Sequence, residues 1–146
     1  MTIFGDLRAF AAALRDQGSL LALDVSKRRF GIAGTDVERR LTKPLRTLQR
    51  QGFRYDVTAL GALVQTREAV GLVVGLPLMA DGRFGPRAQA AKDTARSLGG
   101  ELRLPVWLQD ERWSTAEATA RGGDDATAAQ IILDDTLRDL HRLGLR

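Results

Sequence analysis

The stretch that decides the fold is residues 20–34, which read LLALDVSKRRFGIAG. Its first four residues form a continuous apolar run, which is typical of a central strand covered on both faces. The run ends at Asp24, and the short basic turn 26–28 leads into a second run at 29–34. The pattern therefore predicts a β-hairpin whose first strand ends in a carboxylate.

Further extended segments complete a sheet around this hairpin. A segment at about 40–48 contains Pro44, which has no backbone N–H to donate and so fits an edge strand. Continuous apolar runs at 69–74 and 104–108 predict two more buried strands. With the hairpin they give a mixed five-stranded sheet.

Helical periodicity and capping signals separate these strands. They predict helices in five segments, namely 3–14, 55–68, 86–98, 114–121 and 124–140. Asp56 is the expected N-cap of the second segment, and Asp124 is the expected N-cap of the last. Hairpins followed by helical crossovers indicate one α/β domain over residues 1–146, with helices on both faces of the sheet and an N-terminal helical extension at 1–18.

The composition restricts the available chemistry. The 146 residues include no cysteine and a single histidine, His141. Thiol nucleophiles, iron–sulfur clusters and cysteine-ligated zinc are excluded, and serine–histidine triads and multi-histidine metal sites are disfavoured. The remaining catalytic groups are the 18 carboxylates.

The charge balance points to an anionic partner. The chain has 22 basic and 18 acidic residues, a net charge of +4 and a pI near 10.3. Nineteen of the basic residues are arginine, whose planar fork suits bidentate phosphate contacts, although a biased genome gives the same enrichment. No apolar run approaches the roughly 20 residues of a membrane span, and no signal-peptide pattern is present. We expect a cytoplasmic protein that binds nucleic acid and no membrane.

Acidic residues stand at the ends of the predicted strands. Asp24 ends the first apolar run, Asp110 and Glu111 follow the last one, and Asp125 lies in the first turn of the final helix. Ligands of open α/β sheets gather at the carboxyl ends of the strands. Each acid also has a structural reading, as a turn residue, a helix cap or a charge favoured by the helix dipole.

Three converging carboxylates would repel one another, and a divalent cation removes that cost. Hard oxygen ligands select Mg²⁺ or Mn²⁺, and such sites hydrolyse phosphodiesters without histidine or cysteine. The spacing of residues 24, 111 and 125 does not itself show that they meet.

Four blocks of the sequence resemble the YqgF (RuvX) family. They occur in the order found in that family and read DVSKRRFGIA at 24–33, VVGLPLMADG at 73–82, DERWSTAEA at 110–118 and DATAAQIIL at 125–133. The family usually has glycine and threonine where this chain has Ser26 and Lys27. The segment between residues 117 and 125 is also shorter than in many members.

The resemblance implies an RNase H-like fold related to Holliday-junction resolvases and a role in maturing the 5′ end of pre-16S rRNA. By position, Asp24, Glu111 and Asp125 are implied as the catalytic and metal-binding set, with Asp110 as the fallback for the second position. A metal-activated water would attack phosphorus and leave 5′-phosphate and 3′-hydroxyl ends. The basic residues that flank the motifs are our candidates for backbone contacts: Lys27, Arg28, Arg87 and Arg112.

Rival functions remain open at this point. The fold could hold structured RNA or a transcription or ribosome-assembly factor without cutting, or it could resolve branched DNA. A phosphotransferase related to sugar kinases would need two such domains, which 146 residues do not supply. A junction resolvase should be a homodimer, whereas the sequence is equally compatible with a monomer.

Overall fold

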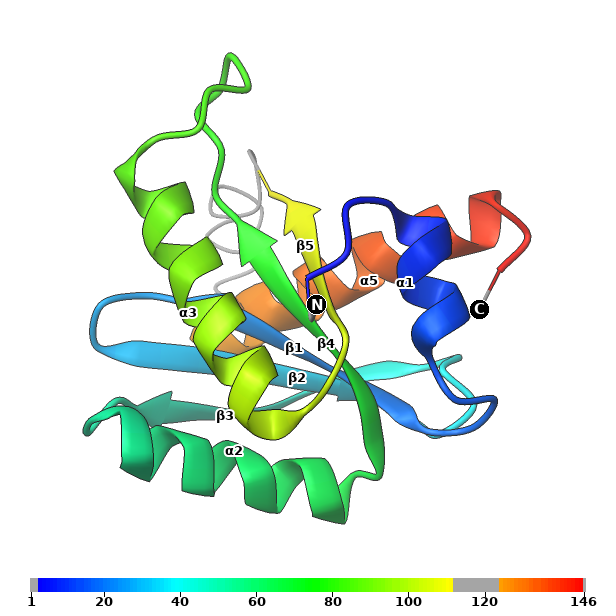
Figure 1. The fold of residues 1–146 in the computed structure, drawn as a ribbon, viewed down its shortest axis with the longest axis horizontal. Coiled ribbons are helices and arrows are strands. Elements are labelled where there is room, and N and C mark those ends of the chain that lie inside the picture. The colour runs from blue at the N-terminus through cyan, green and yellow to red at the C-terminus, as the bar shows by residue number, and fades with distance from the viewer. Residues whose placement is uncertain (1–2, 112–123, 146) are drawn as a thin grey trace.

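The computed structural model describes residues 3–111 and 124–145. In chain order the elements are α1 (Leu7–Ala13), β1 (Ser19–Val25), β2 (Arg29–Thr35), β3 (Thr42–Gln49), α2 (Phe53–Thr66), β4 (Ala69–Leu76), α3 (Pro86–Leu102), β5 (Val106–Asp110) and α5 (Asp125–Arg142) (Figure 1). The helix expected at 114–121 lies outside the described residues.

The strands form one five-stranded sheet in the order β3-β2-β1-β4-β5. The pairs β1–β2 and β2–β3 are antiparallel, and the pairs β1–β4 and β4–β5 are parallel. The predicted hairpin, the mixed sheet and the edge position of the proline-containing strand are confirmed. Residues 19–23 of β1 are all buried, as expected for an apolar run at the centre of a covered sheet.

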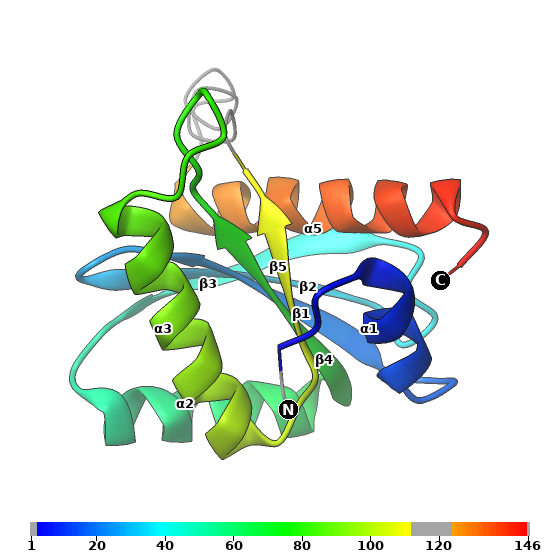
Figure 2. The ribbon, with the colours of Figure 1, turned by 45° about the horizontal axis from the view of Figure 1, so that its top comes forward.

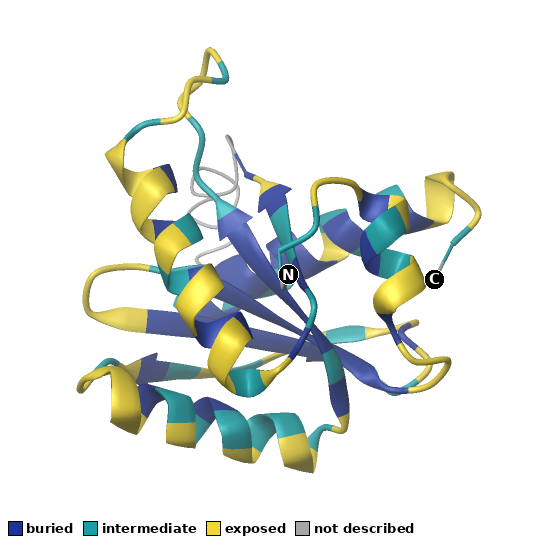
Figure 3. Ribbon diagram, viewed as in Figure 1, coloured by how far each residue is buried: buried dark blue, intermediate teal, exposed yellow. Residues whose placement is uncertain are grey.

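Helices cover both faces of the sheet. Helices α2 and α3 lie on one face and α5 lies on the other (Figure 2). Because side chains alternate along a strand, the sheet supplies two separate cores. Leu21 and Leu23 of β1 join the core under α2 and α3, whereas Leu20 and Ala22 join the core that α1 and α5 share. Figure 3 shows buried residues concentrated on the sheet and on the helix faces turned toward it. None of the described helices is long and apolar enough to cross a membrane.

Two local expectations are wrong. Asp56 does not cap α2, which begins at Phe53 with Gly52 as its N-cap. Gly52 adopts φ +108°, a conformation that side chains rarely tolerate, and this lets the helix start earlier. The buried Asp56 carboxylate instead accepts the backbone N–H of Gln51 at 3.0 Å and lies 3.8 Å from Nε of Arg50.

The N-terminal helix is also shorter than the periodicity suggested. Ile3 forms an isolated parallel bridge with Val106 of β5, and only Leu7–Ala13 is helical. The Asp6 carboxylate accepts the backbone N–H of Ala9 at 2.8 Å and so caps this helix. Ile3 and Phe4 therefore extend the sheet edge beside β5 before the helix begins.

Candidate active site

Strand alternation directs Asp24 toward α5. Ala22 packs in the core shared with α5, and Asp24 lies two residues further along the same strand. The carboxylate at the end of β1 is thus placed on the side of the sheet that α5 covers.

Two glycines flank Asp24 on the neighbouring strands. Gly31 of β2 is its register partner, and Gly75 of β4 is one residue beyond the Leu23–Val74 pair. A Cβ on Gly31 would overlap the carbonyl group of Asp125, and one on Gly75 would lie 2.5 Å from Cδ1 of Ile132. The absence of side chains at these two positions lets α5 approach the sheet directly over Asp24.

This close approach places two carboxylates in one electrostatic environment. Burial, and secondarily the charge of Asp125, raise the pKa of Asp24 from its usual 3.8 to about 6. Arg87 opposes the shift, so its guanidinium acts on the same carboxylate. Desolvation and a like-charged neighbour both disfavour the ionised form, so Asp24 lies in a site that would favour an added positive charge.

The first turn of α5 fixes the position of Asp125. The Asp124 carboxylate accepts the backbone N–H of Thr127 at 2.8 Å, which confirms the predicted cap. Nε of Arg29 donates to Oδ2 of Asp125 at 2.7 Å, while the arginine and aspartate side chains are 46% and 31% exposed. The backbone of Asp125 therefore packs against Gly31, and its carboxylate is bound by Arg29.

The end of β5 distinguishes the two remaining acids. Buried Gln109 accepts the hydroxyl of Thr136 at 3.0 Å and donates to Asp139 at 3.0 Å, so it faces α5. Glu111, two residues on, is only 7% exposed, and its Cγ lies 3.6 Å from where a Cβ of Gly75 would be. Asp110 is exposed, and because side chains alternate along a strand it lies on the opposite face of the sheet from Gln109 and Glu111. The geometry favours Glu111 over Asp110 as the third acid.

The predicted backbone-contact residues have different outcomes. Arg87 is exposed at the start of α3 and lies within electrostatic reach of Asp24. Lys27 and Arg28 are exposed in the β1–β2 turn, which adjoins the same end of the sheet. Arg112 lies outside the described residues.

Three contributors were missed by the sequence analysis. Arg29 was not distinguished from the other cations of the turn, and its ion pair with Asp125 spans 96 positions of the chain. Gly31 and Gly75 carried a usable signal, because a glycine inside a strand often marks close approach of another backbone. Nothing in the sequence shows which segment makes that approach.

Carboxylate oxygens such as those of Asp24, Glu111 and Asp125 are suitable ligands for a hard divalent cation. The raised pKa of Asp24 indicates a position where a bound cation would offset the cost of desolvation and of repulsion by Asp125. Within residues 3–111 and 124–145, no group of three acids or histidines is drawn together closely enough to form a metal-ligating cluster. The donor chemistry fits a metal, and the arrangement described here is that of two adjacent acids with a third nearby.

The architecture is shared with a class of nucleic-acid enzymes. A structure titled "T. thermophilus RuvC in complex with Holliday junction substrate" matches with a TM-score of 0.55 over 86% of this chain and 96% of that chain, at 9% identity. A second Thermus thermophilus RuvC structure gives a TM-score of 0.50 at 13% identity and covers 87% and 97%. These likenesses show that the fold is RNase H-like.

The sequence comparison places the chain within one family of that class. The family model RuvX, described as Holliday junction resolvase, matches residues 18–139, and the chain belongs to this family. Relatives named "Putative pre-16S rRNA nuclease" include one from Rhodospirillum rubrum, 46% identical over 93% of this chain and 92% of the relative. Another, from Bradyrhizobium sp. (strain ORS 278), is 41% identical over 83% and 76%.

Proposed function

We propose that the chain is a metal-dependent endonuclease that hydrolyses phosphodiester bonds during processing of the 5′ end of pre-16S rRNA in the cytoplasm. Its assignment as a hydrolase of nucleic acid rests on the family and on the relatives named as nucleases. The observation that carries the site is the placement of Asp24 between Gly31 and Gly75, beneath the first turn of α5.

Asp24, Glu111 and Asp125 would hold Mg²⁺ or Mn²⁺. When bound, the cation would supply Lewis-acid polarisation of the phosphate and would lower the pKa of an attacking water. Asp24 contributes a partly buried carboxylate on the central strand, and Asp125 contributes one fixed by a capped helix. Both acids are thus preorganised by secondary structure before substrate arrives.

The substrate backbone would lie across the carboxyl end of β1 and the adjoining turn. Arg87 brings a guanidinium close enough to act on Asp24, so a phosphate bound there would lie beside the acids. Lys27 and Arg28 add exposed cations on the other side of β1. Such contacts position a nucleic acid without reading its sequence.

Arg29 is proposed as a positioning residue. Its 2.7 Å hydrogen bond to Oδ2 of Asp125 sets the carboxylate orientation and leaves Oδ1 available to another ligand. Because the pair is partly exposed, its own stabilising energy should be about 1 kcal/mol or less. Its role would therefore be orientation more than stability.

The test is a cleavage assay on a pre-16S 5′ fragment with Mg²⁺, Mn²⁺ or EDTA. Asp24→Asn and Glu111→Gln should each abolish cleavage while the circular dichroism spectrum and the thermal midpoint show a folded protein. Asp110→Asn is the matched control, because it removes the same charge from the adjacent, exposed position on the other face. Cleavage retained in both Asp24→Asn and Glu111→Gln would refute the assignment.

A second candidate function is resolution of branched DNA. It is favoured by the family description and by the fold shared with RuvC. The same assay on a four-way DNA junction distinguishes the two substrates, and symmetric paired cuts by a homodimer would favour the junction. Metal-independent binding of either nucleic acid, without cleavage, would instead indicate a binding protein on this fold.

A further inference from the structure

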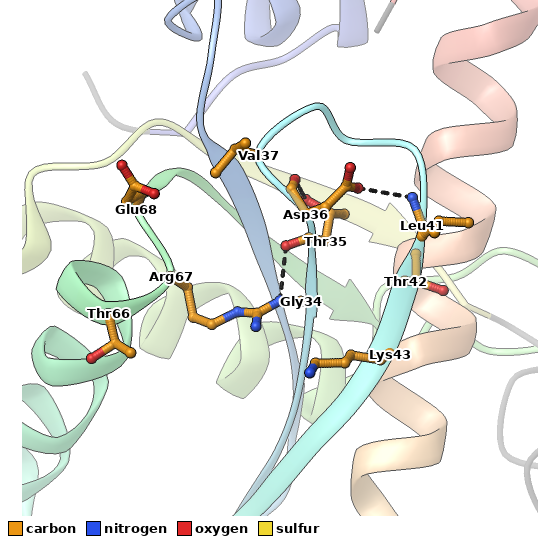
Figure 4. Close-up of a pocket in the computed structure, with 10 residues that line it drawn as sticks. All are labelled: Gly34, Thr35, Asp36, Val37, Leu41, Thr42, Lys43, Thr66, Arg67 and Glu68. Carbon is orange, nitrogen blue, oxygen red and sulfur yellow. Dashed lines mark hydrogen bonds between the residues drawn. The ribbon is translucent and has the colours of Figure 1, made fainter.

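A cavity of about 470 Å³ lies at the far end of β2 from the acidic site. Thr35 in its wall is four residues along β2 from Gly31, the partner of Asp24, a separation of about 13 Å at strand rise. The cavity is bordered by the ends of α2 and β2 and by the start of β3 (Figure 4). None of the residues that line this cavity belongs to the acidic site.

Two cations from different elements point into this cavity. Arg67, the C-terminal cap residue of α2, donates from Nη2 to the carbonyl of Thr35 at 3.0 Å. Its Nε is buried and has no hydrogen-bond partner among the described residues. Lys43 of β3 enters from the opposite wall, and Figure 4 shows its ammonium directed toward the Arg67 guanidinium.

Gly34 lies beside both cations. It is the register partner of Lys43, and a Cβ at Gly34 would lie 3.0 Å from Cδ1 of Leu45, 3.4 Å from Cδ2 of Leu21 and 3.5 Å from Nε of Arg67. A larger residue at this position would crowd Leu45 and the Arg67 side chain.

Two carboxylates, those of Asp36 and Glu68, also line the cavity. The Asp36 carboxylate accepts the backbone N–H groups of Arg40 and Leu41 at 2.8 and 2.9 Å, and these bonds lower its pKa. Figure 4 shows the Glu68 carboxylate directed away from the guanidinium. Within the described part of the chain, neither Lys43 nor Arg67 forms an ion pair. The cavity therefore holds two facing cations that form no ion pair with the two carboxylates beside them.

We propose that this cavity is a phosphate-binding site for a terminal phosphate monoester or a free phosphorylated ligand. A dianionic monoester would accept charge-assisted hydrogen bonds from the Lys43 ammonium and the Arg67 guanidinium. A volume of about 470 Å³ is within the range of small-ligand pockets and leaves room for the group that carries the phosphate. The site is independent of the acidic residues and of the proposed nuclease reaction.

The first test measures inorganic phosphate binding by titration calorimetry, with the Arg67 Nε–H resonance followed by NMR. Lys43→Gln should weaken binding about tenfold, as expected for loss of a charge-assisted contact. Arg46→Gln is the matched control, because Arg46 is exposed on the same strand and is not part of the cavity lining. Equal weakening by both variants, or no phosphate binding by the wild-type chain, would overturn the proposal.

The second arm separates this site from the nuclease site and identifies the source of the phosphate. Asp24→Asn should leave phosphate affinity unchanged, and loss of binding in that variant would overturn the proposal by placing the phosphate at the acidic site. The binding affinity of an RNA with a 5′-phosphate is compared with that of the same RNA with a 5′-hydroxyl and with that of a mononucleotide. If the 5′-phosphate increases RNA affinity and Lys43→Gln removes that increase, the site binds RNA ends. If only the mononucleotide shows binding that depends on Lys43, the site binds a small ligand.

Discussion

Gly31 lies directly beneath Asp125, so close that a Cβ on the glycine would overlap the aspartate's carbonyl group. Gly31 is also the register partner of Asp24. One residue without a side chain thus sets how closely the two acids approach each other. The contact joins the hairpin to the last helix across almost a hundred residues of chain.

Replacing this glycine should displace the start of α5. We expect Gly31→Ala to lower the free energy of unfolding by about 1–3 kcal/mol, since the added methyl has no space, and to reduce cleavage strongly. Urea unfolding and the cleavage assay measure the two effects. Gly100→Ala in α3 is the control, because nothing lies within 4 Å of its added Cβ. That variant should gain up to about 1 kcal/mol from helix propensity and keep its activity.

Asp24→Asn should alter the pH dependence of stability. Since the folded pKa of about 6 exceeds the usual 3.8, the folded state binds the proton more tightly, and stability falls as pH rises from about 4 through 6. The full shift corresponds to at most about 3 kcal/mol above this window. Asp24→Asn should therefore be more stable than the wild type at pH 8 and nearly equal to it at pH 4. Urea unfolding in EDTA tests this, and a difference that does not change with pH would contradict it.

Divalent cations should offset the loss of stability that the ionised Asp24 carboxylate causes. At pH 8, Mg²⁺ or Mn²⁺ should raise the thermal midpoint of the wild type, because a ligand that binds only the folded state stabilises it. The increase should be absent from Asp24→Asn and present in Asp110→Asn. An equal increase in all three proteins would show that the stabilisation does not come from this site.

Arg29→Gln should separate metal binding from catalysis. Removing a cation that occupies Oδ2 of Asp125 should tighten Mn²⁺ binding in the absence of nucleic acid about two- to fivefold, which matches the energy of a partly exposed ion pair. Cleavage should fall, because Asp125 loses its orientation. Arg28→Gln, in the adjacent turn, should leave Mn²⁺ affinity nearly unchanged. Titration calorimetry decides the prediction, and weaker Mn²⁺ binding in Arg29→Gln would refute it.

The cap of α5 should contribute measurably to stability. Asp124→Ala removes the acceptor of the Thr127 N–H and should cost about 0.5–2 kcal/mol in urea unfolding. Asp124→Asn keeps an oxygen acceptor and should cost much less. The backbone N–H of Thr127 lowers the pKa of Asp124, so this contribution is present above the usual pKa and is lost as pH falls through the lowered value. Equal losses in the two variants would show that the cap does not act through this hydrogen bond.

Local patterns in the sequence were sufficient for most elements. The apolar run at 20–23 predicted the buried central strand, Pro44 predicted the edge strand, and Asp124 predicted the start of α5. These features depend on residues that are close in sequence, so their periodicity and hydrogen-bonding groups can be identified from the sequence alone. Asp56 was wrongly assigned because the backbone freedom of Gly52 set the start of α2 instead.

The hairpin, the mixed sheet and the acids at the strand ends follow from local sequence patterns, and the motifs identify the family. In contrast, the proximity of Asp24 and Asp125, the position of Glu111 rather than Asp110 on their side of the sheet, and the contact of Arg29 with Asp125 become visible only in the folded chain. These relationships depend on strand register and on how closely α5 packs over Gly31 and Gly75. Such contacts join residues about a hundred positions apart, and local periodicity carries no information about that distance.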